Sequence, residues 1–213
     1  MADIFEEVDE ELKEENFKKL WDRYGTYLTA AVILLVGGVA AYKFWESYTH
    51  DQRQAYSEAF ISAVALAEEG KNSDAASAFT IIAEDASAGY AMLARFREAS
   101  SRRKDGDTSA ALDIYETLAV DDSIEPLYQD LAVLLSVMAQ ADKGDPKALS
   151  DRLAPLTADG PWRHTAGEYI GLFALRQGDT AAARKRFEMI ADDAQAPRGT
   201  RQRAAELLQT LGK

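Results

Sequence analysis

The chain of 213 residues contains no cysteine. It therefore has no disulfide, no thiolate metal ligand and no cysteine nucleophile. Histidine is scarce, with only His50 and His164, and His50 has no acid three or four residues after it. Glu168 stands four residues after His164, a spacing more typical of a surface contact on a helix than of a metal or catalytic site. We expect no metal centre and no cofactor.

Catalytic motifs are also missing from the sequence. It has no P-loop, no glycine-rich dinucleotide fingerprint and no nucleophile elbow. The acid pairs Asp121-Asp122 and Asp192-Asp193 are interpreted as the acidic ends of loops. An enzyme is therefore the weakest of the functional classes considered, and we expect neither catalytic activity nor a small-molecule substrate.

Basic residues are outnumbered, with 24 Lys and Arg against 36 Asp and Glu, for a net charge of −12. A protein that binds phosphate backbones needs basic faces, so the balance argues against nucleic acid as a partner. Two local basic runs are interpreted as solvated faces, with contact to an acidic partner as the alternative. They comprise Arg95, Arg97, Arg102, Arg103 and Lys104, and then Arg184, Lys185, Arg186, Arg198, Arg201 and Arg203.

Charge is absent from nineteen consecutive residues, 24–42, between Arg23 and Lys43. As an α-helix this stretch is about 28 Å long, close to the roughly 30 Å hydrocarbon thickness of a bilayer. Aromatic side chains, which settle among lipid headgroups, flank it on both sides. They are Trp21, Tyr24 and Tyr27 on one side and Tyr42, Phe44, Trp45 and Tyr48 on the other. The pattern predicts a transmembrane helix over residues 24–45 rather than a buried core helix.

The preceding segment, residues 1–23, is acidic and amphipathic, with nine acids against four bases. A signal peptide has a short basic leader and an apolar core of roughly 7–15 residues, so we expect an anchor. Cleavage after the small residues 38–40 stays open. Four bases precede the span, and only Lys43 and Arg53 follow it closely. This bias predicts a cytoplasmic N-terminus and a periplasmic domain over residues 46–213 of a bacterial inner-membrane protein.

A repeat follows the span, marked by glycines in steps of 36, 38 and 34 residues, at Gly70, Gly106, Gly144 and Gly178. Each glycine is expected to end a helix in the left-handed conformation, and the Asp that follows three of them is expected to cap the next helix. Apolar or small residues stand seven positions before each glycine and five, nine and twelve after it. They are Ala63, Ala75, Phe79 and Ile82; Ala99, Ala111, Tyr115 and Leu118; Val137, Leu149, Leu153 and Leu156; Gly171, Ala183, Phe187 and Ile190.

This pattern resembles the tetratricopeptide repeat, a helix–turn–helix unit of about 34 residues. The best copy covers residues 161–193, whereas the first copy has Lys71 in place of Asp and the third has Leu149 in place of Ala. Residues 198–211 are predicted to form a closing helix. The expected fold is all-α, a single N-terminal transmembrane helix followed by a tetratricopeptide-like solenoid of helical hairpins.

The layout as a whole resembles the YfgM-type ancillary subunit of the bacterial Sec translocon. The resemblance rests on LysLysLeuTrpAspArgTyrGly (18–25) and AlaTyrLysPheTrp (41–45) around the span, followed by a degenerate repeat array. It implies a membrane-anchored interaction scaffold whose partners are the SecYEG channel and a membrane-anchored periplasmic chaperone and prolyl isomerase. A general periplasmic scaffold in envelope assembly or cell division is the alternative.

By resemblance to tetratricopeptide arrays, the first helices of successive hairpins line the concave binding face. These helices are expected over residues 89–104, 125–142 and 162–177. Aromatic residues and Arg most often anchor protein interfaces, although packing between hairpins is the alternative role for each aromatic. The predicted partner-binding residues are Tyr90, Arg97, Tyr128, Trp162 and Tyr169.

Overall fold

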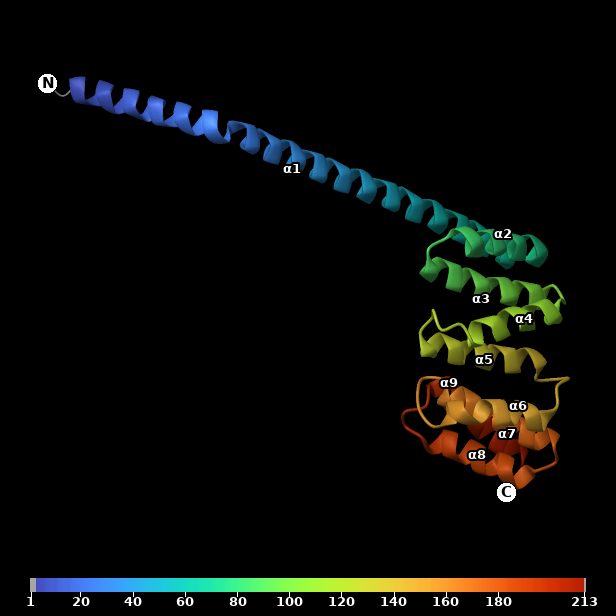
Figure 1. Ribbon diagram of the computed structural model, residues 1–213. Coiled ribbons are helices and arrows are strands. Elements are labelled where there is room, and N and C mark those ends of the chain that lie inside the picture. The colour runs from blue at the N-terminus through green and yellow to red at the C-terminus, as the bar shows by residue number, and fades with distance from the viewer. Residues whose placement is uncertain (1–2, 213) are drawn as a thin grey trace. The chain divides into compact units, whose positions relative to one another are not determined.

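The computed structural model describes residues 3–212 and contains only helices and connecting turns in that range (Figure 1). The all-α prediction is confirmed for these residues; the predicted segments also include residues 1, 2 and 213, which lie outside them. The elements are α1 Asp3–Glu68, α2 Asn72–Asp85, α3 Ala88–Lys104, α4 Thr108–Ala119, α5 Pro126–Gln140, α6 Pro146–Leu153, the 3-10 helix η1 Ala154–Thr157, α7 Arg163–Arg176, α8 Thr180–Asp192 and α9 Arg198–Thr210.

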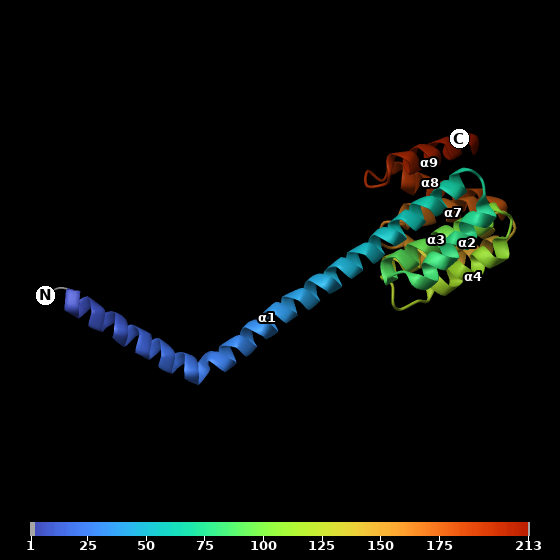
Figure 2. The same ribbon diagram turned by 90° about the horizontal axis from the view of Figure 1, so that it is seen from above.

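The chain divides into two compact units, one ending at Ala55 and the other beginning at Tyr56. The first unit is the N-terminal part of α1, which bends within it (Figure 2). Large apolar side chains stand exposed on this helix, with Ile33 at 70% and Leu34 at 76%. From Trp21 onward α1 is long and apolar enough to cross a membrane, by length and composition. This helix contains the segment for which the sequence predicts a span.

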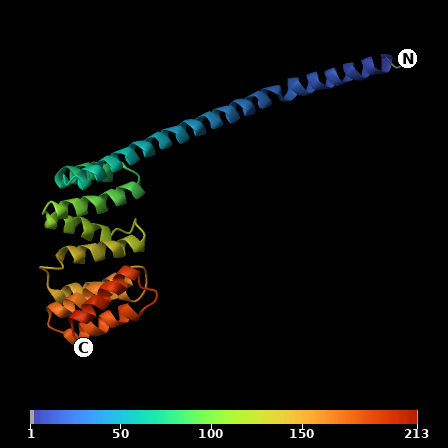
Figure 3. The same cartoon turned by 180° about the vertical axis from the view of Figure 1, so that it is seen from behind.

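The second unit is a stack of helical hairpins (Figure 3). The last part of α1 packs against α2 around Ala63 and Phe79. The pairs α3/α4, α5/α6 and α7/α8 follow, and α9 closes the stack against α8. The predicted helix bounds agree with α3, α5, α7 and α9 to within two residues.

The predicted repeat register is confirmed by burial. All sixteen residues at the four aligned positions are buried, including Phe79, Leu153 and Phe187 at 0% exposure. A hairpin hides one apolar stripe between its own two helices and another against the neighbouring hairpin. The four positions that repeat in the sequence are the ones that fill these two contacts.

The predicted left-handed caps occur at three of the four aligned glycines. The backbone angle φ is +80° at Gly70, +96° at Gly106 and +77° at Gly178. The prediction is wrong for Gly144, whose φ is not positive. A side chain is excluded there by close packing, because a Cβ atom would lie 2.8 Å from Cδ1 of Leu149 and 3.2 Å from the Gln140 carbonyl oxygen.

The predicted aspartate caps are all present. Asp107 accepts a hydrogen bond from the backbone N–H of Ala110 at 3.1 Å. Asp145 accepts one from Ala148 at 3.0 Å, and Asp179 one from Ala182 at 2.9 Å. Lys71, which replaces Asp in the first copy, makes no side-chain cap. Each capping Asp satisfies an N–H group that the first turn of a helix leaves without a partner.

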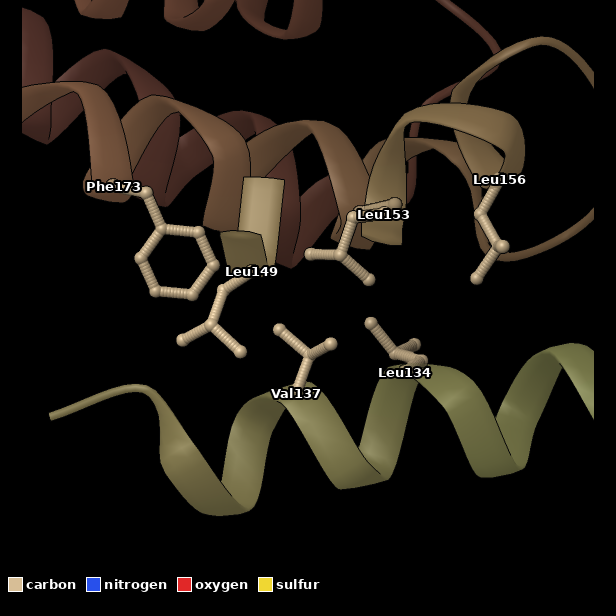
Figure 4. Packing of buried hydrophobic residues seen from close by; sticks show 7 residues of the cluster. Leu134, Val137, Leu149, Leu153, Leu156 and Phe173 are labelled. Carbon is tan, nitrogen blue, oxygen red and sulfur yellow. The ribbon is translucent and has the colours of Figure 1, made fainter. Parts of the chain in front are cut away.

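The core of the C-terminal half joins the third hairpin to the fourth. Leu134 and Val137 of α5 face Leu149 and Leu153 of α6, Leu156 of η1 and Phe173 of α7 (Figure 4). All of them are 7% exposed or less. This cluster fixes α5 and α7 relative to each other. These helices carry the predicted binding residues Tyr128 and Tyr169, and Trp162 stands immediately before α7.

Candidate interaction surface

The five predicted binding residues occupy only two positions of the repeat. Tyr90, Tyr128 and Trp162 each stand 16 residues before Gly106, Gly144 and Gly178, respectively. Arg97 and Tyr169 stand nine residues before their glycines, the first and the third of these. The structure therefore places the five side chains in series on the first helices of successive hairpins, α3, α5 and α7, with Trp162 immediately before α7.

Three of the aromatic residues also pack between helices. The Trp162 indole N–H donates to the Leu127 carbonyl oxygen at 3.0 Å, which ties the start of α7 to the start of α5. The Tyr169 ring packs against the core cluster that α5, α6 and α7 share, and burial raises the pKa of its hydroxyl. The Tyr90 ring lies edge-on to Phe60 at 6.2 Å. All three remain partly exposed, so packing and binding are compatible at each position.

Arg97 and Tyr128 are the freer members of the set. Arg97 is exposed and lies beside a cavity of about 120 Å³ between α1, α2 and α3. Tyr128 is half-buried and forms no ring contact with any aromatic residue that the structure describes. These two side chains can therefore be truncated with the least disturbance to the stack.

The expected surface contact between His164 and Glu168 is wrong. His164 is 9% exposed, and its Nε2 lies 2.7 Å from Oδ2 of Asp193 in the turn after α8. This hydrogen bond lowers the pKa of Asp193. Glu168 is 6% exposed and accepts two hydrogen bonds from Arg203 of α9, both 2.7 Å. The spacing rule fails because α7 packs against both α8 and α9, so these side chains meet other helices instead of each other. No described group of three or more His, Cys, Asp or Glu residues could hold a metal ion.

Members of the basic runs such as Arg103 and Arg203 are exposed, as expected for solvated faces, but several members also bind other parts of the chain. Arg102 pairs with the buried Glu98 at 2.7 Å, and Arg203 pairs with Glu168. Arg184 donates to the Leu211 carbonyl oxygen at 3.1 Å and to that of Gly212, so it completes the C-terminal end of α9. A cation at this end of a helix is favourable because the last carbonyl groups carry partial negative charge.

The sequence analysis did not predict a set of hydrogen-bonded ion pairs that join successive hairpins, here called polar ties. Glu116 of α4 accepts two hydrogen bonds from Arg152 of α6, at 2.7 and 2.6 Å, and one from Ser136 of α5 at 2.6 Å. The bond from Arg152 is the main cause of the lowered pKa of Glu116. The pairs Glu116/Arg152 and Glu168/Arg203 are separated by 36 and 35 residues. In the sequence, an acid followed by an arginine about one repeat later could have predicted each of these ion pairs.

These features define a helical-hairpin repeat protein that carries one long apolar helix. A family model described as a tetratricopeptide repeat-like domain matches residues 18–210. The chain belongs to this family, since the match covers most of its length. No curated protein and no solved structure matches the chain. The repeat domain indicates a scaffold for protein–protein interaction.

Proposed function

We propose that the protein is an ancillary subunit of the SecYEG translocon that links the channel to periplasmic chaperones. The main support for this proposal is the extent of the family match, which begins at Lys18 and includes the apolar helix as well as the repeats. The helix and the hairpins thus belong to one family unit. Lys18 also opens the flanking motif on which the resemblance to translocon subunits rests.

In this proposal the protein lies in the bacterial inner membrane with its N-terminus in the cytoplasm. Four bases precede the apolar stretch and two follow it closely, and the side with more Lys and Arg stays in the cytoplasm. The repeat domain then faces the periplasm. The total lack of cysteine means that its stability does not depend on the redox state of that compartment.

Partners dock on the first helices of the hairpins. Arg97 and Tyr128 are the proposed anchors, because they are accessible and of the residue types that most often contribute binding energy. The partly buried Tyr90, Trp162 and Tyr169 shape the same surface.

Affinity purification of the tagged full chain from solubilised membranes, followed by mass spectrometry, tests the proposal. Channel subunits and a chaperone in stoichiometric yield are expected. Arg97→Ala with Tyr128→Ala should reduce that yield, whereas Lys185→Ala with Arg186→Ala on α8 should not. Recovery of envelope-assembly or division proteins without channel subunits would contradict the proposal and favour the alternative scaffold role.

A reporter fused to the C-terminus tests the orientation. A reporter that is active only outside the cytoplasm should give signal, because the chain has one predicted span and its bases favour the N-terminus inside. Activity of a cytoplasm-specific reporter at the same position would overturn the proposed topology.

A further inference from the structure

A small cavity lies between the end of α1, α2 and α3, with a volume of about 120 Å³. Helix α3 contributes four polar residues to the lining, Arg97, Ser100, Ser101 and Lys104, and α1 contributes Glu68. The four residues of α3 are spaced at i, i+3, i+4 and i+7, which places them on one face of the helix. Two positive charges and two hydroxyl groups therefore converge on one space.

The two bases in this lining form no ion pair with an acid of the part of the chain that the structure describes. Elsewhere on α3, Arg95 pairs with Asp121 at 3.7 Å and Arg102 with Glu98 at 2.7 Å. Neither Arg97 nor Lys104 forms an ion pair with any described residue. Their charges remain available to a group that enters the cavity.

Ser101 adds a hydrogen-bond donor to the cavity. It is only 3% exposed, yet its hydroxyl forms no hydrogen bond with any described residue. Among the described residues only Oδ1 of Asn72 is a fully buried side-chain atom without a partner, so the Ser101 hydroxyl keeps access to the solvent that fills the cavity. The hydroxyl lines the cavity and can donate to an oxygen placed there.

The rest of the lining selects the charge and shape of the ligand. Glu68 of α1 contributes one negative charge, so the cavity carries a net charge of about +1. This matches a carboxylate better than a doubly charged phosphate. The partly exposed Val64 and Ala67 offer apolar surface, which suits the methylene groups that lead to a side-chain carboxylate.

We propose that this cavity binds one Asp or Glu carboxylate of a partner protein. Arg97 and Lys104 neutralise the charge, and the Ser101 hydroxyl donates a hydrogen bond to one oxygen. The identity of the ligand as a protein side chain rests on the proposed scaffold function, whereas the carboxylate chemistry rests on the cavity alone.

Amide NMR of the full chain in detergent micelles tests the cavity. The probe is N-acetyl-glutamate N-methylamide, whose only charge is the side-chain carboxylate, and the control is its glutamine analogue at equal ionic strength. Saturable shifts of the Ser100, Ser101 and Lys104 amide signals are expected with the glutamate probe and absent with the control. Lys104→Gln should weaken binding about tenfold, the effect of losing a hydrogen bond to a charged group.

Arg103→Gln is the matched control, because Arg103 is exposed on the same helix, forms no ion pair with any described residue and does not line the cavity. This variant should keep the affinity of the unmodified chain. Equal weakening by Arg103→Gln would overturn the proposal, since it would show only the general field of the helix. So would shifts with the glutamine analogue, a lack of saturation, or tighter binding of inorganic phosphate.

The result of the probe titration can be distinguished from the result of the co-purification that tests the proposed function. The probe titration requires no partner protein, so its failure removes the cavity site and leaves the co-purification result standing. Saturable binding of the probe without any co-purified protein would instead support the carboxylate chemistry and contradict the scaffold role.

Discussion

The third and fourth hairpins occupy equivalent places in the repeat but pack in opposite ways. In the fourth, Gly171 of α7 faces Phe187 of α8 so closely that a Cβ atom would lie 2.5 Å from Cε1 of the ring. In the third, the positions equivalent to Gly171 and Phe187 are Val137 and Leu153, both fully buried. A small residue under a large ring and two interlocking aliphatic side chains therefore fill the same contact.

The third hairpin relies more on its neighbours than the fourth does. Helix α6 has only eight residues and is followed by the 3-10 turn η1. Arg176 of α7 donates to the carbonyl oxygens of Ala141 and, at 3.1 Å, of Gly144, which holds the turn between α5 and α6. Departures from the repeat pattern are thus offset by polar contacts from adjacent hairpins.

The largest expected effects come from truncating the side chain at the centre of each hairpin. Phe187→Ala should lower the free energy of unfolding by about 4 kcal/mol and Leu153→Ala by about 3 kcal/mol, because each side chain is fully buried and leaves a cavity. Urea unfolding of the full chain in mild detergent, followed by circular dichroism, measures both. An effect of Leu153→Ala below about 1 kcal/mol would show that the third hairpin tolerates cavities.

Replacing a glycine by alanine should show a larger difference in stability loss between the two hairpins. Gly171→Ala places a Cβ against an aromatic ring, with three ring atoms within 3.1 Å. Gly144→Ala places one against Leu149 Cδ1, the flexible end of a side chain, although the Gln140 carbonyl oxygen at 3.2 Å limits relief. We expect a loss of about 3 kcal/mol at Gly171 and about 1 kcal/mol at Gly144, measured by the same unfolding assay. Equal losses would contradict the contrast in packing.

The repeat register was predictable from the sequence because it depends on local geometry. Small residues such as Ala99 and Ala111 approach each other within a single hairpin, and their spacing from the glycine is fixed by the turn. The left-handed conformation predicted for Gly144 was wrong because the third copy, 38 residues after the second, has a different turn at this glycine. The wrong contact between His164 and Glu168 arose because the spacing rule assumes a free helix surface.

The candidate surface was predictable only in part. The repeat spacing gives the helices on which the predicted binding residues lie. It does not reveal that Trp162 would donate to the Leu127 carbonyl oxygen, since that contact depends on how the next hairpin stacks. The cavity beside Arg97 was likewise invisible, because its lining comes from three helices.

The polar ties should give smaller effects than the core. Glu168→Gln, in the fourth hairpin, should cost about 2 kcal/mol, because Glu168 is 6% exposed and loses a charge-assisted pair with Arg203. Glu116→Gln should cost about 1 kcal/mol, since its side chain is 45% exposed and solvent screens the pair with Arg152. Urea unfolding of both variants at neutral pH measures the two losses in the free energy of unfolding.

The pH dependence of stability checks the role of Glu116. Because its folded pKa lies below the ordinary value of 4.5, the charged form contributes stability above that value and loses it as pH falls through the lowered folded pKa. The unmodified chain should therefore lose more stability than Glu116→Gln between about pH 5 and pH 3. Parallel pH profiles would contradict a stabilising pair with Arg152.

The smallest effect is expected from removing the apolar helix. The contrast between the hairpins lies wholly within the unit that begins at Tyr56, so a fragment from Ser47 onward should be soluble and helical. Mutations at distant, independent sites add to within about 0.5 kcal/mol, and we expect the same independence between the two units. The difference between Gly171→Ala and Gly144→Ala should then be unchanged in the fragment, by urea unfolding without detergent. A fragment that is unfolded, or in which the difference disappears, would show that the apolar helix supports the third and fourth hairpins, contrary to the division at residues 55 and 56.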